Sequence, residues 1–462
     1  MIGGLVLHQS LFLKRIQKVA SAAFIIGIAS SAVGLLTSAL LARWLGPLRF
    51  GVYSYVVSLT GMAGVVSSLG FPTLLLRQTS LAKATSNWGP AKGVLIHGAR
   101  VTFLTSVCLG FIVWVIANHF ARFRGMANFH ADVVLAIIAM ICSAIAGLVA
   151  SALQGLDRII ASIVPGSLIG PIGLLLAMVL VQFINGRLGV TVILLCQAVI
   201  ALFLVVFQVA QFGRFAPMEL LRSSYQVRFP GWIVSAIPFL LNSLMIVVNL
   251  RTDIFLLATL RGPEMAGVYT AATRGAMLLV LPLGALATAA RPTMAKLYAQ
   301  GDSIRLQALI SMTSRVSALI ALLGCGLLVL LGKNLLILAF GSAYASGASA
   351  LGILSMFRVI NASTGSLGPF LSMTERQRVL VIGLALEALA NISFNYLLIP
   401  RFGMDGSALA TGGSMALSNI VLSVWVYRTS GHDMSVLGLA THYSREKEAS
   451  DNALGERRPT HL

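Results

Sequence analysis

Residues 46–53 read Gly-Pro-Leu-Arg-Phe-Gly-Val-Tyr, and residues 262–269 read Gly-Pro-Glu-Met-Ala-Gly-Val-Tyr. Both stretches follow the pattern Gly-Pro-x-x-x-Gly-Val-Tyr, and the step of 216 from Gly46 to Gly262 is nearly half of the 462-residue chain. Glycine and proline commonly end one helix and start the next, so each stretch is predicted to be a tight turn between helices. The chain is therefore predicted to contain two copies of one repeat.

Apolar runs surround both copies. Hydrophobic residues make up 57% of the chain, charged residues make up 10%, and the mean hydropathy is +0.90. Soluble proteins have about 25% charged residues, so this composition excludes a soluble enzyme, a disordered chain and a disulfide scaffold. A membrane-spanning helix needs about 20 apolar residues. The qualifying runs are Val19–Leu41, Gly51–Leu69, Val101–Ala121, Val133–Leu153, Ile159–Phe183, Leu188–Phe212, Ser235–Leu257, Val268–Ala290, Ile310–Leu331, Ser349–Pro369, Val379–Ile399 and Gly406–Tyr427.

These runs predict an all-α polytopic membrane protein with about 12 transmembrane helices in two six-helix repeats. Six is an even number, so both halves enter the membrane from the same side and the repeats are parallel. The expected domains are an N-lobe at 1–213, a cytoplasmic linker at 214–230, a C-lobe at 231–428 and a disordered cytoplasmic tail at 429–462. The stretch Asn334–Phe340 is either an interfacial segment or the start of the tenth span.

The distribution of Lys and Arg predicts the orientation. With the N-terminus inside, the inner segments carry 21 of the 33 basic residues and the outer loops carry eight. By the positive-inside rule, both termini are cytoplasmic. The short outer loops leave no room for an extracytoplasmic catalytic domain. The formal charge of +19 sits on the membrane body, because the tail is neutral, and it suggests an anionic lipid surface, an anionic substrate or both.

Ionisable residues within the spans are the main functional signal, because each central one costs about 2.5–3.5 kcal/mol on insertion scales. All of them lie in the second half, and their first-half equivalents are uncharged. They are Arg251, Asp253, Arg274, Arg315, Arg358 and Glu387. Arginine suits a diphosphate, since its planar fork donates two parallel hydrogen bonds and stays charged. Arg274 and Arg358 are predicted to contact such a ligand, with Arg251 and Arg315 assisting.

Two alternatives remain for the assisting arginines, because Arg251 could be paired internally and Arg315 could snorkel to the cytoplasmic interface. A carboxyl within an apolar span can exchange a proton. Glu387, and less strongly Asp253, are therefore candidate ion-coupling residues. Asn391 and Asn395 continue the face of Glu387 at intervals of four residues. They are predicted either to line the substrate cavity or to make hydrogen bonds between helices.

The cysteines and histidines form no metal-binding pattern. Cys108, Cys142, Cys196 and Cys325 each lie in an apolar run and fit small core residues. No Cys-x-x-Cys or His-Glu-x-x-His spacing occurs. No metal or other cofactor is expected.

The first repeat copy and its surroundings resemble a known family. Residues 42–53 are similar to the Ala-Arg-x-Leu-Gly-Pro-x-x-Phe-Gly-x-Tyr signature of the polysaccharide transporter family, which contains the O-antigen-type flippases. This family belongs to the multidrug/oligosaccharidyl-lipid/polysaccharide (MOP) exporter superfamily. Residues 68–71, 340–344 and 403–408 resemble further landmarks of the family. Ser68 stands where the family usually has aspartate.

The resemblance implies a MATE-like bundle of two lobes in a V. It implies a flippase, and no enzyme, that moves polyprenyl-diphosphate-linked oligosaccharide units across the bacterial inner membrane by alternating access for polysaccharide export. The implied partners are the lipid-linked substrate, membrane lipids, a polysaccharide polymerase and glycosyltransferases, and no nucleic acid. The departure at Ser68 places more of the coupling on Glu387 and Asp253.

Three other functions are weighed against this one. An ion-coupled multidrug antiporter of the MATE type would recognise lipophilic cations, which a cavity with four arginines and two acids should repel. A membrane-embedded polymerase or glycosyltransferase would need a large outer loop or an acidic outer site, and Arg43–Phe50 contains no acid. A scaffold for polysaccharide assembly would gain nothing from the cost of charges within its spans.

Overall fold

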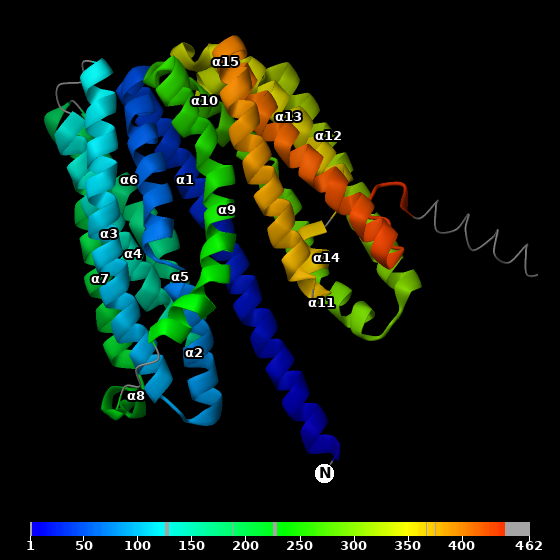
Figure 1. Ribbon diagram of the computed structural model, residues 1–462. Helices are drawn as coiled ribbons and strands as arrows, with labels where there is room; N and C mark the ends of the chain where they lie inside the picture. Colours follow the sequence, from blue (N-terminus) through cyan, green and yellow to red (C-terminus); the bar gives the residue numbers. More distant parts are fainter. Residues whose placement is uncertain are drawn as a thin grey trace, which may run out of the picture. The chain divides into compact units, whose positions relative to one another are not determined.

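The computed structural model describes residues 2–124, 129–186, 188–224, 229–365, 367–374 and 376–438, and the regular structure within them is helical throughout (Figure 1). The first-half helices are α1 (Ile2–Ser67), α2 (Phe71–Thr85), α3 (Gly89–Arg124), α4 (Phe129–Gly155), α5 (Ile159–Val164), the π-helix η1 (Pro165–Ile169), α6 (Gly170–Asn185), α7 (Val190–Phe215) and α8 (Met218–Arg222). The second-half helices are α9 (Phe229–Arg261), α10 (Pro263–Met277), α11 (Val280–Ala299), α12 (Ser303–Phe340), the 3-10 helix η2 (Ser342–Gly347), α13 (Ala348–Ser363), α14 (Leu367–Met373) and α15 (Gln377–Ser430).

The helices account for the predicted spans. Among the described residues, nine helices are long and apolar enough to cross a membrane, and the pair α10–α11, bent by 41°, makes up to ten. Two of them contain a break, at Gly46 in α1 (φ 72°) and at Gly403 in α15 (φ 58°). Each of these two helices therefore corresponds to two predicted spans. The predicted all-α membrane fold is confirmed, because the predicted apolar runs lie in helices.

The predicted turns are also present. The first repeat copy turns at Gly46 within α1, and the second turns at Gly262 (φ 98°) between α9 and α10. Asn334–Phe340 neither lies apart as an interfacial segment nor begins the next span, because it continues α12. The predicted run Ile159–Phe183 is one span that contains a π-helical turn starting at Pro165. Proline lacks a backbone N–H, which favours such an irregularity inside a helix.

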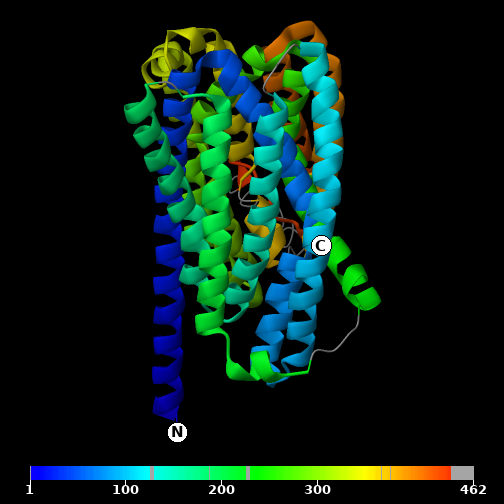
Figure 2. The same cartoon turned by 90° about the vertical axis from the view of Figure 1, so that its left-hand side faces the viewer.

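The chain forms two compact units. Unit 1 comprises Met1–Ala271 and Ala339–Tyr344, and unit 2 comprises Ala272–Leu338 and Ala345–Leu462. In unit 1, α4 packs against α3 and α7, and α9 packs against α1 and α2 (Figures 1 and 2). In unit 2, α13 and α14 pack against α15. The packing of α9 on α1 and α2 is the reason that the first unit extends beyond the predicted N-lobe, and the division into two six-helix lobes stays a prediction.

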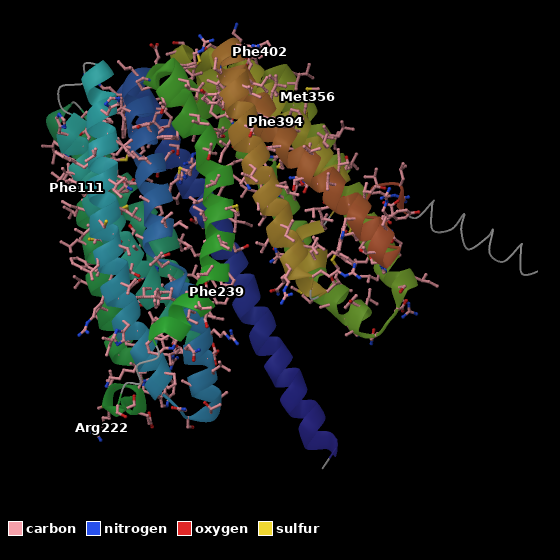
Figure 3. The ribbon with its side chains drawn as sticks, viewed as in Figure 1. Phe111, Arg222, Phe239, Met356, Phe394 and Phe402 are labelled. Atoms are coloured by element: carbon pink, nitrogen blue, oxygen red, sulfur yellow. The ribbon has the colours of Figure 1, made fainter. Side chains whose placement is uncertain are left out.

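Large apolar side chains cover the outside of the helices. Phe111 is 65% exposed and Phe402 is 57% exposed, and both project away from the ribbon (Figure 3). Exposure of large apolar side chains along helices with mean window hydropathies of 1.3 to 2.9 fits a hydrocarbon surrounding, since water would penalise it. The protein is therefore a multi-pass membrane protein.

The start of the predicted tail is ordered. Residues 431–438, named here the C-terminal strap, pack on unit 2 after the end of α15. Gln307 donates to the Asp433 carbonyl at 2.8 Å and accepts from the Asp433 N–H at 3.0 Å. Met434 is 1% exposed. The disorder predicted from residue 429 does not hold for the strap, because side chains of α12 satisfy its backbone groups. Residues 439–462 lie outside the described residues.

Candidate functional site

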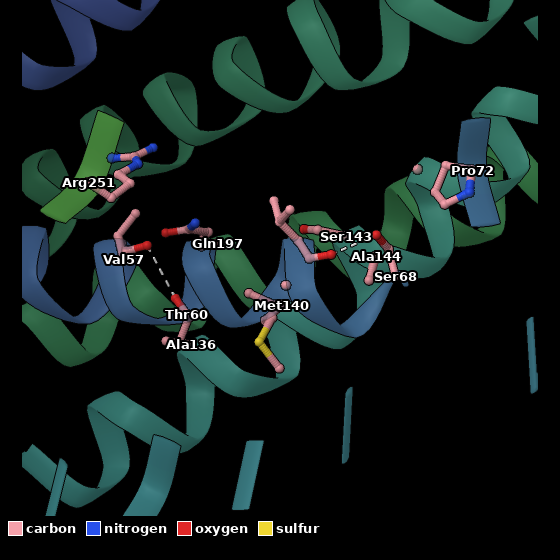
Figure 4. Close-up of a pocket in the computed structure, with 15 residues that line it drawn as sticks. Val57, Thr60, Ser68, Pro72, Ala136, Met140, Ser143, Ala144, Gln197 and Arg251 are labelled. Carbon is pink, nitrogen blue, oxygen red and sulfur yellow. Dashed lines mark hydrogen bonds between the residues drawn. The ribbon is translucent and has the colours of Figure 1, made fainter. Parts of the chain in front are cut away.

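Unit 1 contains a cavity of about 370 Å³ between α1, α2, α4, α7 and α9 (Figure 4). Along α1 it extends from Val57 to Ser68, and its α4 wall is made mostly of small residues such as Ala136 and Ala144. Small side chains leave room between helix backbones that larger ones would fill. The cavity volume lies within the range of about 300–1,000 Å³ that is typical of small-molecule sites.

Neutral polar groups line part of this cavity. Gln197 on α7 accepts a hydrogen bond of 3.4 Å from the Tyr53 hydroxyl through Oε1, which leaves its Nε2 without a hydrogen bond to any residue that the structure describes. The hydroxyls of Thr60 and Ser68 each donate at 2.8 Å to a carbonyl of their own segment, so they present acceptor oxygens to the cavity. The lining therefore offers one amide donor, the two hydroxyl acceptors of Thr60 and Ser68, and a third hydroxyl, that of Ser143.

Arg251 brings the charge to the cavity. It lies on α9, is half-buried, and is the one ionisable side chain among the described residues that form the wall. Its guanidinium makes no ion pair or hydrogen bond within the described part of the chain. A charge at bilayer depth without a protein partner is costly and indicates a functional role. Internal pairing, the alternative left open for Arg251, is not observed among these residues.

Asp253 is held away from Arg251. Its Oδ2 accepts a 3.0 Å hydrogen bond from the Tyr269 hydroxyl, its Oδ1 accepts one of 2.8 Å from the Ile254 N–H, and the residue is 5% exposed. Residues two apart on a helix do not share a face, and Arg251 forms no ion pair with Asp253. The structure gives Asp253 a bonded, buried position outside the cavity wall, and its ion-coupling role stays a prediction.

Unit 2 contains a second polar cluster, named here the C-half cluster: Arg358, Asn361, Glu387, Met415 and Asn419. Arg358 lies close enough to Glu387 for their charges to interact, and its Nη1 is 3.5 Å from the Met415 sulfur. Asn419 donates at 3.0 Å to Asn361, and all five side chains are half-buried. The two predicted residues Arg358 and Glu387 are thus brought together on α13 and α15.

Asn391 and Asn395 serve as links between helices. Asn395 is fully buried, accepts a 2.8 Å hydrogen bond from Ser407 and donates at 3.2 Å to Asn391 Oδ1. Asn391 is 2% exposed and donates to Thr411 and Ser414 at 3.4 Å each. These bonds join the two segments of α15 on either side of Gly403. Of the two functions predicted for the pair, this geometry fits interhelical bonding.

The remaining predicted arginines lie apart within unit 2. Arg274, on α10, is half-buried, with Nη1 4.0 Å from the Met277 sulfur. Arg315, on α12, is exposed and donates from Nε to the carbonyl of Val436 in the C-terminal strap at 3.0 Å. Arg315 therefore anchors the strap. Among the described residues, no three His, Cys, Asp or Glu side chains gather as a possible metal site.

Sequence reasoning missed the neutral wall of the cavity. It did not select Gln197 or Thr60, although Gln197 interrupts the apolar run Leu188–Phe212 in the same way that the selected asparagines interrupt their own runs. A search for amides within first-half spans would have found Gln197. Its proximity to Thr60 and Arg251 depends on the fold, because α1, α7 and α9 are distant in sequence.

Comparisons with solved structures show the fold. An inward-facing multidrug resistance MATE family transporter of the MOP superfamily matches with a TM-score of 0.71 and 15% identity, over 88% of this chain and 99% of that one. The lipid II flippase MurJ matches with a TM-score of 0.63 and 12% identity, over 88% of this chain and 87% of that one. A MOP superfamily transporter from Pyrococcus furiosus matches with a TM-score of 0.57 and 16% identity, over 88% of this chain and 93% of that one.

The sequence comparison shows the family. No curated protein sequence gives a match. The family described as polysaccharide biosynthesis protein matches residues 17–298, which is more than half of the chain and includes both repeat copies and the whole cavity. The resemblance seen at residues 42–53 is thus confirmed. The chain belongs to the polysaccharide biosynthesis protein family, on the fold of the MOP superfamily transporters.

Proposed function

We propose that the protein is a flippase that moves polyprenyl-diphosphate-linked oligosaccharides across the bacterial inner membrane by alternating access. Its family membership and transporter fold support this proposal. The observation that carries it is the guanidinium of Arg251, which lines a cavity between predicted membrane-spanning helices and makes no ion pair within the described part of the chain.

The cavity chemistry fits the two polar parts of such a substrate. A guanidinium binds diphosphate oxygens through charge-assisted hydrogen bonds and cannot lose its proton. The Gln197 amide and the hydroxyls of Thr60 and Ser68 match the neutral hydroxyl groups of a sugar. The polyprenyl chain stays in the surrounding lipid throughout, so its movement from one leaflet to the other exposes no apolar surface to water.

The residues of unit 2 complete the proposal. Arg274 and Arg358 are proposed to contact the diphosphate as well, and Glu387, beside Arg358, is proposed to couple transport to an ion gradient. Arg315, whose Nε is bonded to the C-terminal strap, is proposed to assist with its remaining N–H donors. The enzymes that complete the lipid-linked glycan and the polymerase that consumes it are the expected partners.

Export of lipophilic cations on the same fold is the rival function. The MATE match supports the shared fold, but a cavity whose one charged side chain among the described residues is an arginine repels cations. We therefore favour an anionic lipid as the substrate, and a transporter over a polymerase.

Binding of undecaprenyl diphosphate to the purified protein tests the proposal. Arg251→Ala is expected to weaken binding by about 10- to 150-fold, the loss expected for a hydrogen bond to a charged group. Arg222→Ala removes an exposed arginine of the same unit and should leave binding unchanged. Export of polysaccharide by a deletion strain that carries each variant should follow the same order. Equal binding by the Arg251→Ala and native proteins would refute the assignment.

A further inference from the structure

The two repeat copies contact each other within unit 1. Residues 46–53 belong to α1, and residues 262–269 lie at the start of α10, directly after α9. Gly51 of the first copy lies against Pro263 of the second, and Gly267 of the second lies against Pro47 of the first. The same positions of the motif thus meet in a reciprocal way. We name these four residues the glycine seam.

The seam is a contact of backbone on backbone. A methyl group placed on Gly51 would overlap the carbonyl oxygen of Pro263 and stand 3.0 Å from the nitrogen of Gly267. A methyl group placed on Gly267 would overlap the carbonyl oxygen of Pro47 and stand 2.9 Å from the nitrogen of Gly51. Carbon atoms at their best separation are about 3.5–4.0 Å apart. Neither position can therefore carry a side chain while the seam is formed.

Further bonds close the chain at the same place. The Tyr344 hydroxyl donates at 2.8 Å to the carbonyl of Ala42, and Arg43 Nε donates at 2.9 Å to the carbonyl of Ala339. Tyr344 is buried and meets the ring of Phe50 edge-on, with centroids 6.3 Å apart. These contacts also lie within unit 1, and they hold the segment Ala339–Tyr344 across the first repeat copy.

We propose that the glycine seam is the outer gate of the transporter: it is formed in the state described here and parts when the cavity opens to the outside. The inference rests on the alternating access of the proposed function and on the predicted topology, which places both Gly-Pro turns at the outer ends of their helices. A contact of this kind suits a gate, because without intervening side chains it is either formed or lost. Its opening separates α1 from α9–α10.

Alanine substitutions with cysteine labelling test the gate. Cys108, Cys142, Cys196 and Cys325 are first replaced by alanine, and Val268→Cys adds one thiol beside Gly267 at a buried position. A membrane-impermeant maleimide added to whole cells then reports opening. Gly51→Ala should raise the labelling rate by about tenfold or more, the population shift expected from overpacking a tight contact. Polysaccharide export should fall at the same time, because the gate no longer closes.

Matched glycines serve as controls. Gly34 lies on α1 and Gly284 on α11, and a methyl group on either meets no atom within 4 Å. Gly34→Ala and Gly284→Ala should therefore leave labelling and export unchanged. Combining Gly51→Ala with Gly267→Ala should add little to either single change, since both break one contact.

The outcomes separate the gate from the substrate proposal. If the Gly51→Ala protein elutes as the native protein does but labels no faster, the gate is refuted. If the alanine variants fail to fold, Arg43→Ala decides, because it adds no atom and removes one closing bond; unchanged labelling of that variant then overturns the gate. Faster labelling together with no binding of undecaprenyl diphosphate by the native protein would support the gate and reject the substrate class.

Discussion

At the scale of single residues, the cavity combines two kinds of hydrogen-bond donor. Arg251 donates with a full charge, and Gln197 donates with a neutral amide whose oxygen is held by Tyr53. A charged donor forms its stronger hydrogen bonds with the anionic oxygens of a phosphate, whereas a neutral amide donates hydrogen bonds to the hydroxyl or carbonyl groups of a sugar. The two residues should therefore report on different parts of one ligand.

Gln197→Ala should weaken binding of undecaprenyl diphosphate that carries an N-acetylhexosamine by about 2- to 12-fold, the value of one neutral hydrogen bond. Binding of undecaprenyl diphosphate without a sugar should not change, which makes the bare lipid the internal control. Isothermal titration of both lipids into the purified variant checks this. An equal loss for both lipids would mean that Gln197 shapes the cavity instead of reading the sugar.

The sequence could name residues of the site but not sort them by role. Arg251, Asn391 and Asn395 are all polar interruptions of apolar runs, and insertion cost alone does not separate them. Only the packing of the two α15 segments shows that the asparagines satisfy each other and Ser407, whereas Arg251 faces a cavity. Whether a polar group has a partner depends on neighbouring helices.

At the scale of elements, the apolar runs predicted the helices well and their ends less well. Hydropathy identifies an apolar segment that can lie in lipid, but it does not show how far the helix continues beyond that segment into more polar sequence. For this reason hydropathy does not decide between the two predictions for Asn334–Phe340, and the structure shows that the segment extends α12. The strap after α15 was missed because its order depends on Gln307, more than 120 residues away.

Gln307→Ala tests that dependence. The change removes both hydrogen bonds to the backbone of Asp433, so it should lower the free energy of unfolding by about 1–3 kcal/mol. Denaturant unfolding of the purified protein in detergent measures the difference. Gln300→Ala, at an exposed position after α11, should change it by less than about 0.5 kcal/mol. If both variants unfold alike, the strap contributes nothing to the stability of unit 2.

At the scale of the whole molecule, the number of spans and the distribution of basic residues predict on which side of the membrane the ends lie. The break at Gly403 divides α15 into two spans, as Gly46 divides α1, so the described helices accommodate an even number of crossings. An even number returns the chain to the side on which it began. With 21 basic residues on the inner side and eight on the outer loops, that side is predicted to be the cytoplasm.

Fusions at the C-terminus test this topology. Green fluorescent protein attached after Leu462 should fluoresce, because it folds in the cytoplasm, and alkaline phosphatase at the same position should be inactive because it needs the oxidising periplasm. Fluorescence and phosphatase activity of intact cells are the measurements. The reverse pattern would invert the assignment of inner and outer ends, and with it the side on which the glycine seam opens.

The reciprocity of the glycine seam bears on how the chain arose. Each copy of the motif supplies both a glycine and the proline carbonyl that the other copy's glycine receives. Such an interface would form equally well between two identical half-length polypeptides related by a twofold axis. In the present chain, neither glycine can gain a side chain without loss of fit to its counterpart. A fusion of two identical half-length chains would therefore account for the reciprocal fit of the two copies.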